Sequence, residues 1–206
     1  MGFNLEELLK TVLELYSKYG IKSVTMDDIS RELGISKKTL YTFVSDKNEL
    51  VEKVIDYQCE KRLIWIKSLN LDKLPALEEI VEVSKMINKM FGEFNPSFHY
   101  DLSKYYTNIY KKMMAINRES MAQSMLHNIK KGKKEGYYRP EINEELIVKM
   151  HIANVENLAE IDFYNSEKWT RQEIQSEIYT YHMFAILNEK GVKEYMRLLN
   201  SENQTN

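Results

Sequence analysis

Residues 20–50 read GIKSVTMDDISRELGISKKTLYTFVSDKNEL and contain three candidate helix caps, at Thr25, Ser36 and Asp46. Side chains of these types accept hydrogen bonds from the free N–H groups in the first turn of a helix. Thr25 is followed three residues later by Asp28, which is the spacing of a capping box with Asp in place of Glu. Gly34 permits the left-handed backbone that ends a helix. The stretch therefore predicts two short helices and the start of a longer one, over residues 26–33, 37–44 and from 46 onward.

Two short helices joined by a tight turn are typical of a helix-turn-helix unit, in which the second helix enters the major groove of DNA. Leu40 and Phe43 are expected to face the core, which leaves cations, hydroxyls and a phenol on the outside. Such groups hydrogen-bond phosphates and base edges. Each of them alone is more often part of a solvated helix face, and the whole arrangement favours DNA. The predicted DNA-binding residues are Thr25, Ser36, Lys37, Lys38, Thr39, Tyr41, Thr42 and Lys47.

The charge of this stretch is balanced, so any binding to DNA must depend on where the charges point. Residues 20–50 hold five cations and five acids. The acids occupy expected helix N-terminal positions, whereas the cations are expected on the groove side. We predict modest affinity for random DNA and a measurable salt dependence from a few phosphate contacts.

The composition of the whole chain indicates long helices. The 206 residues include 43% hydrophobic residues but only 7 Gly and 3 Pro, so the chain has few places to turn. The single cysteine, Cys59, excludes an internal disulfide framework and a Cys-rich zinc site. The N-terminus does not resemble a signal peptide, and no apolar stretch is long enough to span a membrane. We expect a cytoplasmic, all-α protein. Outside the two short helices, helices are expected over residues 4–19, 46–69, 75–92, 106–134, 144–163, 171–190 and 192–199, with a further region from 96. The helical period places an apolar stripe on one face of the first of these, formed by Leu5, Leu8, Leu9, Val12, Leu13 and Tyr16.

The first quarter of the chain resembles the N-terminal signature of TetR-type bacterial repressors. The residues that carry the resemblance are Gly20-Ile21, Val24 to Ser30, Leu33 to Ser36, Thr39-Leu40-Tyr41 and Lys47 to Leu50. Lys38 departs from the pattern where the family often has a small residue, and Val44 departs where an aromatic residue is usual. The resemblance implies that Thr25 and Lys47 contact phosphate, and that residues 37–39 lie on the groove with Tyr41 at backbone or base.

The same resemblance implies an all-helical homodimer with two domains. Residues 1–47 would form a three-helix DNA-binding domain, joined by a long helix to a ligand-sensing and dimerisation domain over residues 48–206. A two-fold dimer would place its recognition helices about 34–36 Å apart on a palindromic operator.

The remainder of the chain is rich in aromatic residues and methionines, which suit an adaptable apolar pocket or simply a core. The candidate pocket residues are Trp65, Met86, Met90, Tyr106, Tyr110, Met114 and Met125. Apolar stripes on two later helices predict a four-helix dimer interface, with packing inside one chain as the alternative. The candidate interface residues are Leu146, Met150, Leu158, Ile161, Ile174, Ile178, Tyr181 and Ala185.

The sequence shows no pattern typical of an enzyme. Its four histidines lack metal-site spacing, and it contains no phosphate-binding glycine loop, so we expect no metal and no cofactor. The sequence therefore predicts a regulator that binds double-stranded DNA and is released from it by an apolar or amphipathic small molecule. The alternatives are a helical module for a small molecule or a protein partner that no longer binds DNA, and, less favoured, a helical enzyme.

Overall fold

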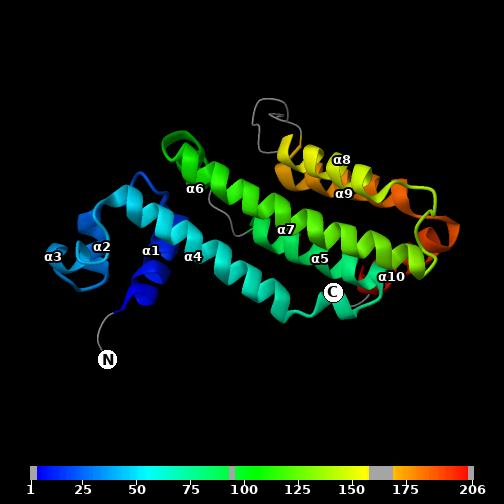
Figure 1. Ribbon diagram of the computed structural model, residues 1–206, viewed down its shortest axis with the longest axis horizontal. Helices are drawn as coiled ribbons and strands as arrows, with labels where there is room; N and C mark the ends of the chain where they lie inside the picture. The colour runs from blue at the N-terminus through cyan, green and yellow to red at the C-terminus, as the bar shows by residue number, and fades with distance from the viewer. Residues whose placement is uncertain (1–3, 93–95, 158–168, 204–206) are drawn as a thin grey trace. The chain divides into compact units, whose positions relative to one another are not determined.

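The computed structural model describes residues 4–92, 96–157 and 169–203, which are almost entirely helical (Figure 1). This confirms the predicted all-α fold. Within the described residues, no helix is both long enough and apolar enough to cross a membrane. The elements in chain order are α1 (Leu5–Tyr19), α2 (Met26–Glu32), α3 (Lys37–Leu40), α4 (Lys47–Ser68), the 3-10 helix η1 (Leu71–Lys73), α5 (Ala76–Gly92), α6 (Pro96–Tyr105), α7 (Thr107–Lys134), α8 (Glu144–Asn157), α9 (Arg171–Ile186) and α10 (Glu189–Asn203).

The chain divides into two compact units. Unit 1 comprises Met1–Leu69 and Glu93–Asn117, and unit 2 comprises Asn70–Gly92 and Arg118–Asn206. Unit 1 thus contains α1 to α4, α6 and the first part of α7. Unit 2 contains η1, α5, the rest of α7 and α8 to α10.

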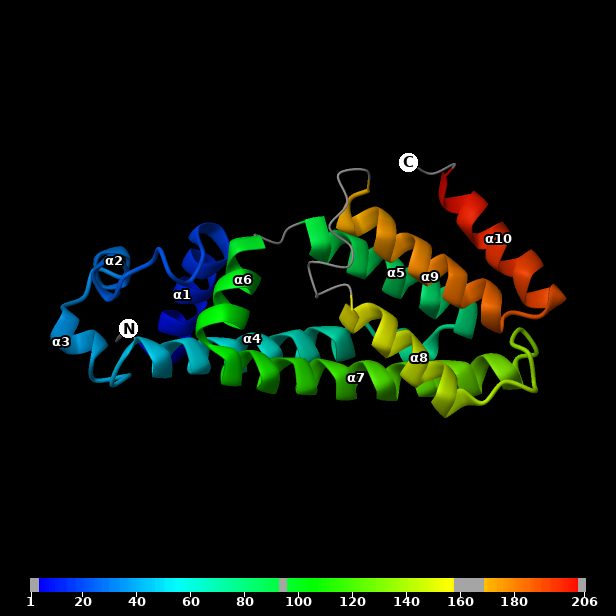
Figure 2. The same cartoon turned by 90° about the horizontal axis from the view of Figure 1, so that it is seen from above.

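The core of unit 1 forms around α1 and α4. Of the apolar stripe expected over residues 4–19, Leu8, Leu9, Val12 and Tyr16 are buried on one face of α1, whereas Leu13 is partly buried and Leu5 is 39% exposed. The four buried side chains pack in one cluster with side chains of α4 such as Val54 and with side chains of α6. Figure 2 shows α6 beside α1, a neighbour far away in the sequence. The helix-turn-helix segment is therefore attached to a scaffold of three longer helices.

The second short helix is shorter than expected. The sequence predicts a helix over residues 37–44, but α3 ends at Leu40. After this point the N–H groups of Thr42 and Phe43 bond to carbonyls three residues back, which is the tighter 3-10 pattern. The Thr42 hydroxyl also donates to the Thr39 carbonyl oxygen, at 2.6 Å. Local bonds of this kind compete with continuation of the helix.

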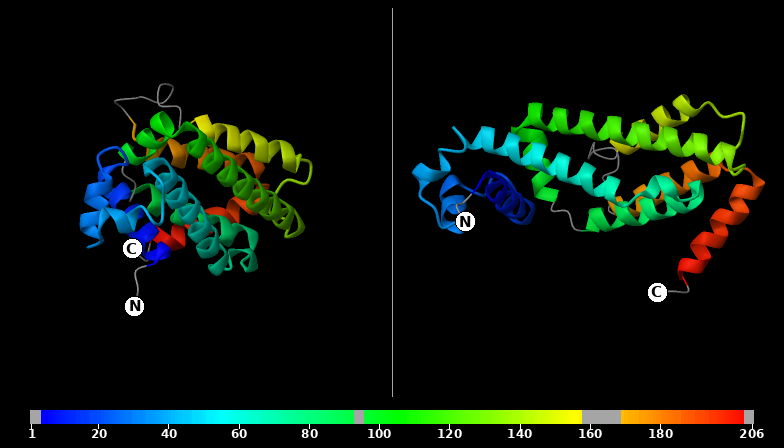
Figure 3. Two further views of the ribbon diagram at one scale, coloured as in Figure 1. Left: turned by 60° about the vertical axis from the view of Figure 1, so that its left-hand side comes forward. Right: turned by 60° about the horizontal axis from the view of Figure 1, so that its bottom comes forward.

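The core of unit 2 joins α5, the second part of α7, and α8 to α10. Ala76, Leu77, Ile129 and Met183 are among its fully or almost fully buried side chains. Figures 1 and 3 show α8 in yellow beside α9 in orange. The predicted helix over residues 144–163 is confirmed as far as Asn157, and its remainder lies outside the described residues.

The predicted helix over residues 171–190 is too long, because α9 ends at Ile186. Leu187 has extended backbone and forms an isolated antiparallel bridge with Tyr138. The N–H of Arg139 donates to the Ile186 carbonyl, and the N–H of Asn188 donates to the Tyr137 carbonyl. These bonds to a segment about fifty residues earlier end α9, and α10 then begins at Glu189, three residues before the expected start.

Candidate nucleic-acid interface

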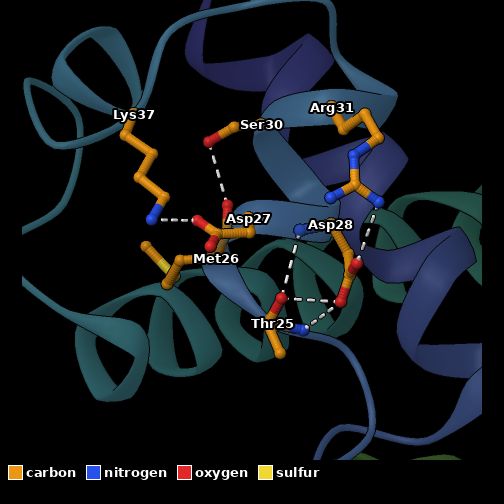
Figure 4. Close-up of polar contacts among 7 residues, drawn as sticks. All are labelled: Thr25, Met26, Asp27, Asp28, Ser30, Arg31 and Lys37. Atoms are coloured by element: carbon orange, nitrogen blue, oxygen red, sulfur yellow. Dashed lines mark hydrogen bonds and ion pairs between the residues drawn. The ribbon is translucent and has the colours of Figure 1, made fainter.

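Three side-chain caps fix the geometry of the helix-turn-helix. The capping box predicted at Thr25 is confirmed (Figure 4). Its hydroxyl accepts the Asp28 N–H at 3.1 Å, and the Asp28 carboxylate accepts the Thr25 N–H at 2.9 Å. Ser36 accepts the Thr39 N–H at 3.0 Å, and Asp46 accepts the Glu49 N–H at 2.8 Å. Each helix of the motif therefore begins at the predicted residue.

The turn between α2 and α3 depends on Gly34. Its φ of +64° lies in the left-handed region, which residues with a Cβ rarely adopt. The following N–H, that of Ile35, donates to the Ser30 carbonyl at 3.0 Å and closes the end of α2. The chain is thus turned so that α3 begins at Lys37, three residues after the glycine.

The turn places one continuous set of side chains on the surface. Leu40 is fully buried, whereas Tyr41 is 48% exposed. The predicted contact residues that are exposed on this surface are Ser36, Lys37, Lys38, Thr39, Tyr41 and Thr42. The structure therefore brings six of the eight predicted residues together at α3 and the turn after it.

The two lysines of α3 differ in their partners. The Lys37 ammonium forms an ion pair with the Asp27 carboxylate on α2 (Figure 4). Within the described part of the chain, the Lys38 ammonium has neither an ion pair nor a side-chain hydrogen bond. Lys38 is thus immediately available to an anionic partner, whereas Lys37 must first leave Asp27.

The Lys47 ammonium is hydrogen-bonded within the protein. Its ammonium donates to the carbonyl oxygens of Ile21 at 2.7 Å, Val24 at 2.6 Å and, more weakly, Lys22 at 3.5 Å. Burial lowers the pKa of this ammonium. The three bonds hold the loop between α1 and α2, and a phosphate contact would have to replace at least one of them. The phosphate role predicted for Lys47 stays a prediction.

Asp101 on α6 holds the same loop from another side and was missed by the sequence analysis. Its carboxylate accepts the Lys22 N–H at 2.7 Å, and the residue is only 8% exposed. A Cβ at Gly20, whose φ is +83°, would lie 3.2 Å from this carboxylate. No local pattern in the sequence marks the contact, because 79 residues separate Asp101 from Lys22.

Most acids of the helix-turn-helix form hydrogen bonds or ion pairs with groups close by. The Thr25 hydroxyl and N–H lower the pKa of Asp28. Hydrogen bonds from the Ser45 N–H and hydroxyl, together with the Lys53 ammonium, lower the pKa of Glu49 to about 2. These carboxylates therefore stay ionised while their charge is directed at helix N-termini and nearby side chains.

The candidate pocket residues are not brought together in one unit. Trp65, which is 44% exposed, belongs to unit 1. Tyr106, which lies between α6 and α7, packs against the core of unit 1 together with Tyr110 and Met114 of α7. Met86 and Met125 belong to unit 2, and the side chain of Met90 lies outside the described residues. Their role in a pocket stays a prediction.

The candidate interface residues that the structure describes fall on the two neighbouring helices α8 and α9. Leu146, Met150 and Tyr181 are large side chains with 55%, 54% and 71% of their surface exposed. Ile174, Ile178 and Ala185 are partly buried, and Leu158 and Ile161 lie outside the described residues.

Comparison with known proteins places the motif in a family. Residues 8–54 match the family model described as "Bacterial regulatory proteins, tetR family". The chain is 25% identical over 176 residues to an uncharacterized HTH-type transcriptional regulator, YvaF, of Bacillus subtilis (strain 168), covering 84% of this chain and 90% of that protein. A transcriptional regulator from Cytophaga hutchinsonii has a similar fold, with a TM-score of 0.74 at 14% identity over 89% of this chain and 98% of the other. A putative regulator from Saccharomonospora viridis, solved in complex with choline, gives a TM-score of 0.59 at 16% identity over 88% and 96%.

Proposed function

We propose that the chain, whose residues 8–54 match the model of the TetR family of bacterial regulatory proteins, is a repressor which a small molecule releases from a palindromic operator. The observation that carries this proposal is the exposed row of cations and hydroxyls on α3, at the end of a turn fixed by three caps. In this proposal residues 1–47 form the DNA-binding domain, and residues 48–206 form the sensing and dimerising domain.

The row on α3 is the expected contact with DNA. In helix-turn-helix proteins the N-terminal residues of the second helix reach base edges, and the helix N-terminus itself favours phosphate. Lys38 supplies a cation that no contact within the described residues holds, and Tyr41 supplies an exposed phenol. We assign phosphate and base contacts to these two side chains together with Lys37, Thr39 and the other predicted residues of the row.

Titration of a labelled duplex tests the DNA-binding part. We would measure fluorescence anisotropy with a duplex from upstream of the protein's own gene and with a shuffled duplex of equal length. Lys38→Ala and Tyr41→Ala are expected to weaken binding to the upstream duplex about 5- to 100-fold, as loss of a DNA contact does. Lys67→Ala, an exposed lysine at the far end of α4, is the matched control and should have no effect. Equal binding of both duplexes would instead favour a module that does not recognise an operator.

The exposed apolar side chains of α8 and α9 support a homodimer. Adjacent large apolar residues with more than half of their surface in water are typical of an interaction site. Two helices from each protomer would form a four-helix bundle. Met150→Glu together with Tyr181→Glu should give a monomer in sedimentation velocity, whereas Met196→Glu on α10, which is 42% exposed, should leave the dimer intact. A dimer that survives the double substitution would contradict this interface.

The proposed effector is an apolar or amphipathic molecule bound among the helices of residues 48–206. The aromatic and methionine content of that region supports an apolar site, and a structural relative solved with choline supports a small-molecule effector. An effector releases DNA only if it binds the two states of the protein unequally. A long-chain fatty acid and a ketosteroid form a first panel, chosen from the names of structural relatives, and at least one should raise the melting temperature and dissociate the labelled duplex. If polar metabolites release the duplex and this panel does not, the effector class is wrong.

A further inference from the structure

Asp27 is an acid of α2 that the capping arrangement does not use. The neighbouring Asp28 completes the capping box with Thr25 and also lies 3.6 Å from the Arg31 guanidinium. The Asp27 carboxylate instead reaches from the first turn of α2 to the Lys37 ammonium at the start of α3 (Figure 4). One of the cations assigned to DNA is therefore already paired with an acid of the protein.

We propose that Asp27 restrains the affinity for DNA by competing with DNA for Lys37, an inference that rests on the proposed DNA-binding function. The ion pair is accessible, because 58% of the Lys37 side chain and 50% of the Asp27 side chain are exposed. A phosphate or base edge can thus replace the carboxylate. The complex gains the contact of Lys37 with DNA but loses the contact with Asp27.

The size of the restraint follows from the exposure of the pair. Exposed ion pairs contribute little to stability, and the loss of one corresponds to about a 1.4- to 5-fold change in an equilibrium constant. When Lys37 binds DNA, the contribution of its ion pair with Asp27 is lost. Lys38 is the next residue, is also exposed, and has no such partner within the described residues, so its contact with DNA carries no similar loss.

A second effect of Asp27 does not depend on Lys37. Once the ammonium binds DNA, the carboxylate remains close to the phosphates and is repelled by them. Salt screens this repulsion over about 10 Å at 0.1 M ionic strength. Substitution of Asp27 alone therefore measures both effects together, and a double-mutant cycle is needed to isolate the competition.

The experiment measures the dissociation constant of the upstream duplex for the wild type, D27N, K37A and the double variant by fluorescence anisotropy. D27N is expected to tighten binding. K37A is expected to weaken binding about 1.4- to 5-fold more in the D27N background than in the wild-type background, because only there is Lys37 free before DNA arrives. K38A should weaken binding by the same factor in the wild-type and D27N backgrounds. E32Q removes an exposed acid from the same helix and should leave the cost of K37A unchanged.

The outcomes separate this inference from the function on which it rests. If the wild type does not prefer the upstream duplex over a shuffled one, the proposed function fails. If it does and K37A costs the same with and without Asp27, Lys37 keeps its contact with Asp27 on DNA and the competition is absent. If K37A costs less in the D27N background, Asp27 positions Lys37 for DNA, and the inference is overturned in the opposite direction. Circular dichroism melting curves of all variants establish that each is folded.

Discussion

Replacement of Lys47 by methionine distinguishes a structural lysine from a phosphate-binding one. Methionine keeps much of the apolar stem and removes the ammonium that holds the Ile21 and Val24 carbonyls at 2.7 and 2.6 Å. A hydrogen bond from a charged group contributes about 1.5–3 kcal/mol, and an unpaired buried carbonyl costs about 1–3 kcal/mol. Ile21 is fully buried and Val24 is 3% exposed, so water replaces the lost donor only in part.

We therefore expect Lys47→Met to destabilise the loop over residues 20–25 by about 2–4 kcal/mol in the absence of DNA. Hydrogen exchange measured by mass spectrometry should report this as a rise of roughly 30- to 700-fold in the exchange rates of that loop, since each 1.4 kcal/mol is a factor of ten. Lys38→Met is the matched control, because its ammonium has no contact within the described residues and its loss should leave exchange unchanged.

A lysine that grips phosphate would behave differently. Its loss would leave exchange in the free protein unchanged and would reduce the slope of log affinity against log salt by about 0.9 for each phosphate contact. Unchanged exchange in Lys47→Met together with a reduced salt slope would refute the reasoning from the loop contacts. The phosphate contact that the sequence predicts for Lys47 would then hold instead.

Three further predictions concern stability. The pKa of Glu49 is lowered to about 2, so its stabilising effect is present above its ordinary value of 4.5 and is lost as the pH falls from 4.5 to about 2. The difference in urea midpoint between wild type and Glu49→Gln should shrink over that window, and a constant difference would contradict the assignment. Burial lowers the pKa of His151 from 6.5 to about 4, so stability should fall as the pH drops from 6.5 to 4, by up to about 3 kcal/mol. The melting temperature of His151→Phe should depend less on pH there, and a profile as steep as that of the wild type would exclude this cause. A methyl group at Gly132 would overlap the buried ring of Tyr138, so Gly132→Ala should lower the free energy of unfolding by about 2 kcal/mol or more, whereas the exposed Lys130→Ala should change it by less than about 0.5 kcal/mol.

The parts of the fold that sequence reasoning predicted are those decided by neighbouring residues. A cap and its partner lie three residues apart, as Thr25 and Asp28 do, so the residue types alone indicate the bond. The left-handed turn at Gly34 is equally local. The apolar stripe of α1 follows from the helical period, and four of its six residues are buried.

The parts that sequence reasoning did not predict depend on distant partners. Backbone bonds from Leu187 and its neighbours to the segment around Tyr138 end α9, and no residue type within α9 indicates this end. The clamp of Asp101 on Lys22 spans 79 positions. Such contacts depend on how helices pack, and a single sequence carries little information about that packing.

The three lysines assigned to DNA show how this limit affects function. In the sequence Lys37, Lys38 and Lys47 are three cations near one helix, with the first two expected on the groove and Lys47 expected on a phosphate. In the structure the Lys37 ammonium pairs with a carboxylate and the Lys47 ammonium bonds to three carbonyls. Of the three, Lys38 is therefore the lysine that would bind DNA without first losing a contact in the described part of the chain. Random DNA offers only phosphates, so contacts with it compensate poorly for the loss of the Lys37 ion pair and of the Lys47 hydrogen bonds. An operator also offers base edges, and a good side-chain contact there is worth about 1–3 kcal/mol, more than an exposed ion pair. Low affinity for random DNA therefore follows from the occupied lysines as well as from the balanced charge of residues 20–50.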